Sequence, residues 1–228
     1  MNILSIDTSS RTFSLCIVKN NKTVASRNIR LNKVLSDAIV PAVDSMLKKT
    51  KTPFSKIDGF AVGLGPGSFT GLRVGISTIK GFAFACQKPV VGACSLDLIA
   101  MAQAAKTDGD IAVICDAKRN MVYGRLYACV KGKIKPKTDC LLTSIEDFLK
   151  DVKNDTLFVG DGVVLFKEQI EKHFRDTRKK VFFVEEKDSN PQACFLAEAA
   201  QEKFKNRKEL TQGVKPMYLY PQDCQVRR

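Results

Sequence analysis

The sequence predicts an α/β protein made of two related halves, each a mixed sheet flanked by helices. Both halves open alike: a short apolar strand ends at an aspartate and a second strand follows, first at 2–7 and 12–18 and again at 111–116 and 121–130. The residues themselves do not repeat, so the likeness lies in the order of the elements. Strands that alternate with segments of helical period favour mixed sheets covered by helices.

The first half continues with a third strand and then with helices. Asn20-Asn21 form a turn into a more polar strand over 22–30, which completes a meander. Apolar pairs recur at helical spacing over 34–47, and Pro41 among them predicts a kink or a restart. After these come a buried strand over 59–64, a helix over 72–85, a strand over 89–93 and a helix over 96–106 capped by Ser95.

Residues 107–110 are the best linker candidate, so we expect two domains, at 1–107 and 108–228. Thr143-Ser-Ile-Glu146 has the spacing of a capping box that opens a short helix. The second half then continues with a strand over 156–160, a basic helix over 163–175, a strand over 181–184, a helix over 191–206 and an irregular segment over 213–224.

The charge is the unusual part of the composition. The 228 residues include 37 Lys and Arg against 24 Asp and Glu, which gives a net charge of +13. Residues 1–96 hold 13 basic and 4 acidic residues, net +9, and neither 8–36 nor 117–138 contains an acid. Such a field indicates a polyanion or an acidic protein as partner, although a generally lysine-rich composition also explains it. Candidates for RNA contact are Lys131, Lys133, Lys135 and Lys137.

Cysteine and histidine usage restricts the chemistry. Eight cysteines occur without a Cys-x-x-Cys pair, which is typical of small buried side chains in a reducing compartment. His173 is the one histidine, so neither a His/Cys zinc site nor a Ser-His or Cys-His nucleophile is expected. The chain opens directly on a strand-like run and has no apolar stretch near 18 residues. We therefore expect no signal peptide, no membrane span and a cytoplasmic protein.

The most distinctive segment lies between a strand and a helix and reads Gly65-Pro66-Gly67-Ser68-Phe69-Thr70-Gly71-Leu72-Arg73-Val74-Gly75. In that setting backbone N–H groups can hold an anion. The segment lacks the lysine of a Walker A loop, and its third glycine comes one residue late for a dinucleotide fingerprint. The alternative is a turn whose glycines permit positive φ and close packing. The helix after it is apolar around most of its circumference, which indicates either deep burial or a face for a partner.

The segment Gly65–Gly75 resembles the signature of the TsaB family, also called YeaZ. Ile3-Leu4-Ser5-Ile6-Asp7-Thr8-Ser9, Pro89-Val90-Val91-Gly92, Gly160-Asp161-Gly162 and Pro216-Met217-Tyr218-Leu219-Tyr220-Pro221 extend the resemblance over most of the chain. It implies two RNase H-like domains of the actin-like ATPase superfamily and a non-catalytic partner of a TsaD-type transferase. That transferase attaches a threonylcarbamoyl group to the adenosine 3′ of the anticodon, in tRNAs that read codons beginning with adenine. A TsaE-type ATPase acts on the complex.

Actin-like ATPases hold phosphates with Asp-x-Gly turns after the first strand of each domain. Here these turns read Asp7-Thr8-Ser9 and Asp116-Ala117-Lys118-Arg119, without the glycine, so side chains crowd the approach of a phosphate. No intrinsic cofactor is expected, and nucleotide would bind only at the partner interface or weakly through the charges of Lys118 and Arg119. The helix over 33–49 also lacks the histidines that hold the metal of TsaD-type catalysts, so no metal site is expected.

The resemblance further implies that the helices over 34–49 and 72–85 pair with the same helices of the transferase, or with a second copy when the chain is alone. The apolar pattern offers as contact residues Leu35, Ile39, Val43, Leu72, Ile76, Ile79 and Lys80. Two other functions stay open at this point: a weak actin-like ATPase or phosphotransferase, and a stand-alone tRNA-binding protein.

Overall fold

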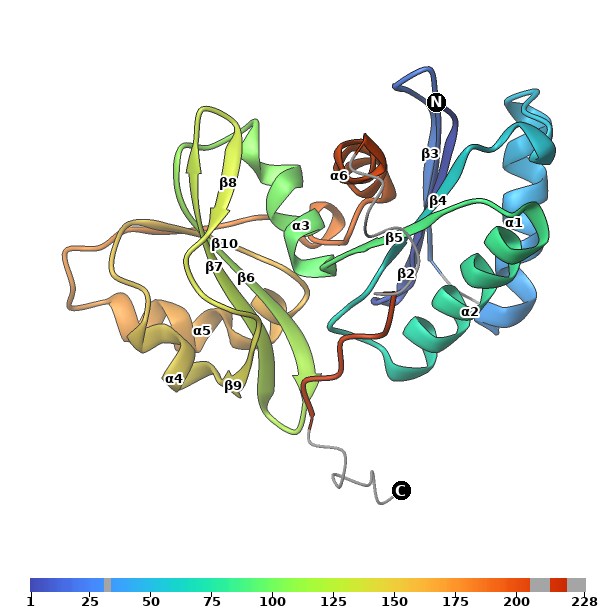
Figure 1. Cartoon of the computed structure of the whole chain (residues 1–228). Helices are drawn as coiled ribbons and strands as arrows, with labels where there is room; N and C mark the ends of the chain where they lie inside the picture. The colour runs from blue at the N-terminus through green and yellow to red at the C-terminus, as the bar shows by residue number, and fades with distance from the viewer. Residues whose placement is uncertain (31–33, 206–213, 221–228) are drawn as a thin grey trace. The chain divides into compact units, whose positions relative to one another are not determined.

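In the computed structural model the chain forms two units, and residues 1–30, 34–205 and 214–220 are described (Figure 1). The first unit comprises Met1–Leu98 and Pro191–Met217, and the second comprises Ile99–Asn190 and Tyr218–Arg228. This division differs from the predicted boundary at 107, because the first unit ends at Leu98, inside the helix Ser95–Ala104, and the last helix returns to the first unit. The predicted helix end at 206 and Pro221 lie outside the described residues.

The first unit contains a five-stranded sheet in the order β3-β2-β1-β4-β5. Strand β1 is antiparallel to β2 and parallel to β4, β2 is antiparallel to β3, and β4 is parallel to β5. The predicted meander is therefore confirmed. The strands are β1 Ile3–Asp7, β2 Thr12–Lys19, β3 Lys22–Arg30, β4 Gly59–Gly63 and β5 Val90–Ala93.

Helices cover both faces of this sheet, because apolar side chains point from it in both directions. Helices α1 (Leu35–Lys49) and α2 (Phe69–Cys86) lie on one face, and α6 (Ala193–Lys205) lies on the other (Figure 1). Pro41 does not restart α1, which is a single helix with the proline inside it. Between α1 and β4 there is one short 3₁₀ turn, η1 (Phe54–Lys56). Helix α3 (Ser95–Ala104) begins in the first unit and ends in the second.

The second unit repeats the plan of the first. Its order is β11-β10-β6-β7-β8, in which β6 is antiparallel to β7 and parallel to β10, and β10 is parallel to β11. Written in reverse, as β8-β7-β6-β10-β11, this order matches β3-β2-β1-β4-β5 of the first unit, with β6 in the place of β1. The predicted likeness in the order of the elements of the two halves is therefore confirmed. Its strands are β6 Gly109–Lys118, β7 Met121–Val130, β8 Lys133–Pro136, β9 Leu141–Ser144, β10 Thr156–Val159 and β11 Val181–Phe183.

Helices α4 (Ile145–Lys150) and α5 (Gly162–Phe174) pack on this second sheet, and η2 (Glu186–Asp188) follows β11. The predicted capping box is shifted by one residue, because it is Ser144 whose hydroxyl accepts the N–H of Asp147 at 3.1 Å. Strands β8 and β9 were not predicted, since β8 is short and rich in lysine and proline, and β9 is only half-buried.

Candidate functional site

The candidate site in the first unit lies where strands β1 and β4 end. These strands are parallel neighbours, with Ile6 opposite Val62, so their carboxyl ends meet at one edge of the sheet. Asp7 ends β1, and the glycine-rich segment 65–75 follows β4. In open α/β sheets this edge is the usual place of a binding site.

Both carboxylate oxygens of Asp7 are engaged within the protein. Oδ1 accepts the backbone N–H of Ser9 at 2.9 Å and the Ser9 hydroxyl at 2.6 Å, and Oδ2 accepts the hydroxyl of Ser95 at 2.6 Å. Asp7 is completely buried. Burial raises its pKa above the ordinary value, although the hydrogen bonds from Ser9 and Ser95 act in the opposite direction.

Ser95 connects this carboxylate to the glycine-rich segment. Its hydroxyl also accepts the N–H of Gly65 at 3.1 Å, and its own N–H donates to the carbonyl of Gly65 at 2.8 Å. The end of β1, the start of segment 65–75 and the first residue of α3 therefore form one hydrogen-bonded cluster.

The glycines of the segment allow it to pack directly on the turn 7–9. A methyl group on Gly67 would lie 2.2 Å from the carbonyl oxygen of Ser9, and one on Gly71 would lie 2.2 Å from that of Thr8. A methyl group on Gly75 would lie 2.1 Å from the Thr8 hydroxyl oxygen. Real Cβ atoms do not approach so closely, so close packing of backbone on backbone requires these glycines. This supports the second of the two interpretations that the sequence left open.

Hydrogen bonds complete the contact between the turn and the segment. The N–H of Ser68 donates to the carbonyl of Ser9 at 2.7 Å, and the hydroxyl of Thr8 donates to the carbonyl of Gly71 at 2.8 Å. The Ser68 hydroxyl caps α2 by accepting the N–H of Gly71 at 3.1 Å. The turn 7–9 and the segment 65–75 thus provide hydrogen-bond partners for each other.

The end of the segment carries exposed side chains. Phe69 and Thr70 are exposed, and the guanidinium carbon of Arg73 lies 3.8 Å from the centre of the Phe69 ring. Pro66 is buried after a cis peptide bond. Segment 65–75 thus has an inner part that packs on β1 and an outer part that faces away from it.

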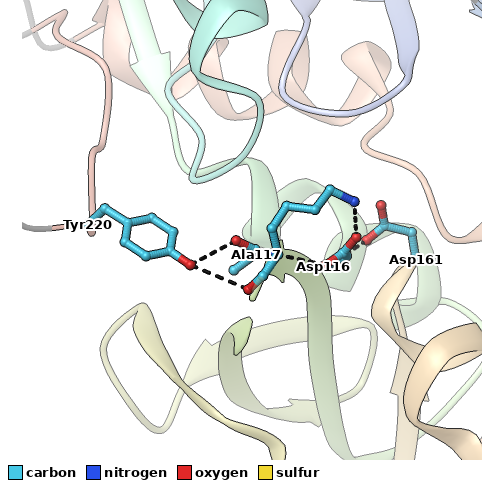
Figure 2. A network of polar contacts seen from close by, with 5 residues as sticks. Asp116, Ala117, Asp161 and Tyr220 are labelled. Atoms are coloured by element: carbon cyan, nitrogen blue, oxygen red, sulfur yellow. Dashed lines mark hydrogen bonds and ion pairs between the residues drawn. The ribbon is translucent and has the colours of Figure 1, made fainter. Parts of the chain in front are cut away.

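The corresponding segment of the second unit, Asp116–Arg119, lies at the end of β6 and has a similar internal arrangement (Figure 2). The N–H of Lys118 donates to Asp116 Oδ1 at 2.8 Å, as the N–H of Ser9 does to Asp7. The Lys118 ammonium pairs with the other oxygen of Asp116. Lys118 and the next residue, Arg119, both have left-handed backbone conformations, with φ of 66° and 54°. Of the predicted turn residues, Asp116 and Lys118 therefore bind each other.

Two more residues hold this second turn. The N–H of Asp116 donates to Asp161 Oδ1 at 3.0 Å, and the Tyr220 hydroxyl donates to the carbonyl of Ala117 at 2.9 Å (Figure 2). Burial raises the pKa of Asp161. Gly160 has φ of 113°, and a methyl group on it would lie 2.1 Å from the carbonyl oxygen of Ile114. Sequence reasoning missed Tyr220 in this role, and the only signal was its place in a family landmark.

The predicted partner-contact residues require a correction. Only Lys80 is exposed, and Leu35 is half-buried against the core. The other side chains are at most 3% exposed and belong to the core of the first unit, namely Ile39, Val43, Leu72, Ile76 and Ile79. Apolar periodicity marks the inward face of an amphipathic helix, and here that face covers the sheet.

The opposite side of α2 is the exposed one. We define the outer face of α2 as Phe69, Arg73, Ser77, Lys80, Gly81 and Phe84, all of which are exposed and lie within one third of the helix circumference. The Phe84 side chain is 88% exposed. On α1, Val40 is 51% exposed, and Val34 just before the helix is 67% exposed. The one sequence signal for this exposed face is Phe84, a large apolar residue that lies outside the apolar stripe of the helix.

Other sites are not indicated in the described part of the chain. Among the residues that the structure describes, no group of three or more His, Cys, Asp or Glu side chains could hold a metal ion. The seven cysteines from Cys16 to Cys194 form no disulfide, and burial raises the pKa of Cys16 to about 11. None of the described helices combines the length and the apolar character that crossing a membrane requires.

Two units with one sheet order, each with a turn after its first strand, define an actin-like ATPase fold. Comparisons with known proteins agree. Residues 30–224 match the model of the family described as TsaD, tRNA N6-adenosine threonylcarbamoyltransferase. The tRNA threonylcarbamoyladenosine biosynthesis protein TsaB of Bacillus subtilis is 32% identical over 75% of this chain and 76% of its own length. The chain belongs to this family and, within it, to the TsaB (YeaZ) proteins.

Two further relatives support the assignment. The TsaB protein of Haemophilus influenzae is 26% identical over 96% of this chain and 93% of its own. The solved structure of YeaZ from Pseudomonas aeruginosa superposes with a TM-score of 0.79, at 23% identity, over 96% of this chain and 99% of that one. The fold is therefore shared over almost the whole length.

Proposed function

We propose that this chain is the non-catalytic subunit that a TsaD-type transferase requires for threonylcarbamoylation of the adenosine 3′ of the tRNA anticodon. The chain acts by docking the outer face of α2 on the transferase. The names of its TsaB relatives and the match to the TsaD model support the pathway and the partner. The observation that carries the docking surface is the exposure of Phe84 beside Gly81 on this face.

Gly81 has no internal reason to be a glycine. It lies inside α2, its φ is not positive, and a methyl group on it would meet no atom within 4 Å. Glycine inside a helix costs about 0.5–1 kcal/mol relative to alanine. Gly63, Gly71 and Gly75, in contrast, each lie against the chain's own atoms. A second helix that packs closely on α2 explains why Gly81 has no side chain.

Phe84 provides the apolar contact beside this gap. It lies one turn after Gly81, with 88% of its side chain exposed, and it follows Ser77 and Lys80 along the same face. A few aromatic anchors in well-packed, desolvated pockets dominate the binding energy of many protein interfaces. Val34 and Val40 add exposed apolar surface at the adjacent helix α1 of the same unit. A transferase helix of the same fold fits this surface, and so does a second copy of the chain when the transferase is absent.

The arrangement of the two turns supports a non-catalytic role. In each turn the backbone N–H two residues after the aspartate is bonded to that aspartate, so a phosphate would have to displace the carboxylate. Asp7 would in addition have to lose Ser95. The one histidine of the sequence, His173, lies on α5, away from both turns in the sequence. It is exposed, and its ring lies edge-on to that of Phe174 with ring centres 4.8 Å apart. Nucleotide binding then belongs to the transferase side of the interface and to the TsaE-type ATPase.

Reconstitution tests the proposal. Purified TsaD-type and TsaE-type proteins of the same source, threonylcarbamoyl-adenylate and tRNA are combined with or without this chain. We expect threonylcarbamoylated tRNA only when the chain is present. Modification at the same rate without the chain, or modification by the chain without the transferase, contradicts the proposal.

Substitutions in α2 test the docking surface separately. Gly81→Gln fills the gap with a better helix former, so we expect the free chain to be at least as stable while its affinity for the transferase falls more than about tenfold. Phe84→Ser is expected to have a similar effect on affinity. Phe182→Ser is the matched control, because Phe182 is 53% exposed on β11 of the second unit. Equal affinities of the Phe84→Ser and wild-type chains argue against the docking surface.

A further inference from the structure

The first sheet ends in a strand whose outer side is covered by no other strand in the described structure. Strand β3 stands last in the order β3-β2-β1-β4-β5, and seven of its nine residues are exposed. An edge strand presents unpaired N–H and C=O groups along its free side. Val24 is the exposed large apolar residue on this strand, at 45%.

Positive charge gathers along this edge without an acid in the sequence to match it. Residues 8–30 hold five basic residues and no acidic one. We define the arginine edge as Arg11, Arg27 and Arg30, all of which are exposed. Within the described part of the chain, none of these three side chains makes an ion pair or a hydrogen bond. Lys137, which directly follows β8, in contrast pairs with Asp110 at 2.6 Å.

The register of the hairpin places the three arginines around the free edge. Arg30 lies opposite Thr12, the residue that follows Arg11, so these two arginines are neighbours at one end of the strand. Arg27 lies opposite Leu15, an odd number of residues from Arg30, so the two project to opposite faces of the sheet. The guanidinium groups thus flank the edge from both sides.

The other end of the hairpin has an acidic neighbour. Glu198 of α6 lines a hollow of about 410 Å³ together with Asn21 and Thr23, the residues on either side of Lys22. The arginine edge lies toward the opposite end of the hairpin, and Lys19 and Lys22 are not part of it.

We propose that the arginine edge binds the phosphate backbone of RNA. The proposal rests on the function proposed above, which makes tRNA the substrate of the complex. Arginine presents a planar fork of donors that matches a phosphate, and its charge does not titrate in the physiological range. A strand of nine residues spans about 30 Å, which gives room for several nucleotides along the edge.

An acidic protein is a weaker fit to the same surface. Protein interfaces have a core depleted of charge and enriched in aromatic residues. Strand β3 contains no aromatic residue, and its exposed positions are mostly polar or charged. Charge at an edge strand also discourages pairing with another sheet, so the experiment must separate that role from RNA binding.

The experiment compares two double variants with the same change of charge. Arg27→Gln with Arg30→Gln removes two members of the arginine edge. Lys133→Gln with Lys135→Gln removes two exposed cations from β8 of the second unit. Each variant is first combined with the TsaD-type transferase, and complex formation is measured by gel filtration. The affinity of each complex for a tRNA transcript is then measured over a series of NaCl concentrations.

We expect both variants to form the complex and to unfold at the wild-type temperature. The slope of log affinity against log salt should fall by about 0.7–0.9 for each phosphate that the protein no longer neutralises, hence by roughly 1.4–1.8 for the arginine variant. The lysine variant should change this slope by less than about half as much.

Equal slopes for the two variants overturn the inference. Failure of the arginine variant to bind the transferase also overturns it, because that result would show that the arginine edge contacts the protein. Failure of the wild-type chain to bind the transferase contradicts the proposed function instead, and the salt slopes of the chain alone with tRNA then decide the RNA contact.

Discussion

The hydroxyl of Ser95 donates to the buried carboxylate of Asp7 across 2.6 Å, and it joins the end of β1 to the first residue of α3. The same hydroxyl accepts the N–H of Gly65, so one serine oxygen connects three segments that are distant in the sequence. Asp7 is the last residue of the first strand, where the carboxyl ends of β1 and β4 meet. Its carboxylate has a structural partner on each oxygen.

The state of Asp7 gives stability a defined pH dependence. Burial raises its folded pKa above the value of 3.8 expected for an exposed aspartate, so the folded chain holds the proton more tightly than the unfolded chain does. The contribution of Asp7 to stability is therefore fully present below about pH 3.8 and is lost as the pH rises through the folded pKa. We expect the wild-type chain to gain stability relative to Asp7→Asn on going from about pH 7.5 to about pH 3.5. Urea unfolding of both proteins at both pH values measures this, and a difference independent of pH contradicts the raised pKa.

The contact between Gly75 and Thr8 makes a second prediction. Gly75→Ala places a methyl group 2.1 Å from the Thr8 hydroxyl oxygen, and overpacking of this kind costs about 1–3 kcal/mol. Thr8→Ala removes that oxygen, so we expect the double variant to be more stable than the sum of the two single changes predicts. Chemical unfolding of the four proteins gives the coupling energy. Gly81→Ala is the control, because its methyl group meets nothing and should stabilise α2.

Sequence patterns predicted the plan of the fold and the location of the site, for physical reasons. Strand and helix periods are local, so the meander and the repeated opening could be read directly. The role of segment 65–75 could not, because its glycines are explained by Thr8 and Ser9, which lie far away in the sequence. The return of α6 to the first sheet also had no local signal, and so the division of the chain differs from the expected one.

The partner-contact residues show a different limit of sequence reasoning. An apolar stripe says that one face of a helix is buried, but it does not say whether the chain's own sheet or a second protein covers that face. Ile76 and Ile79 are covered by the sheet, whereas Phe84 and Gly81 lie off the stripe and are exposed. Exposure in the structure was needed to separate the two sets.

Ile76 and Lys80 provide a direct test of this correction. Ile76 is 3% exposed in the first core, so Ile76→Asp buries an unpaired charge and should destabilise the isolated chain by more than about 4 kcal/mol. Lys80→Asp, one turn later on the outer face, should leave the stability within about 0.5 kcal/mol and weaken binding to the transferase. Circular dichroism during thermal unfolding measures the first effect. An Ile76→Asp chain that folds like the wild type but fails to bind would restore Ile76 as a contact residue.

Tyr220 should stabilise the second turn through two separable contacts. Its hydroxyl donates to the carbonyl of Ala117, and its ring lies edge-on to Tyr123 with centres 6.3 Å apart. Tyr220→Phe keeps the ring and loses the hydrogen bond, so we expect a loss of about 0.5–1.5 kcal/mol in the free energy of unfolding. Tyr220→Ala loses both contacts and should cost about 0.5–1.5 kcal/mol more.

Urea unfolding of wild type, Tyr220→Phe and Tyr220→Ala measures these losses of stability. Amide hydrogen exchange at Lys118 and Arg119 shows whether the losses concern this turn. Because these residues hold φ values of 66° and 54°, release of the turn from Tyr220 should speed exchange there before it affects β10. Unchanged exchange at the turn in Tyr220→Ala would mean that Asp116 and Asp161 hold it without the C-terminal segment.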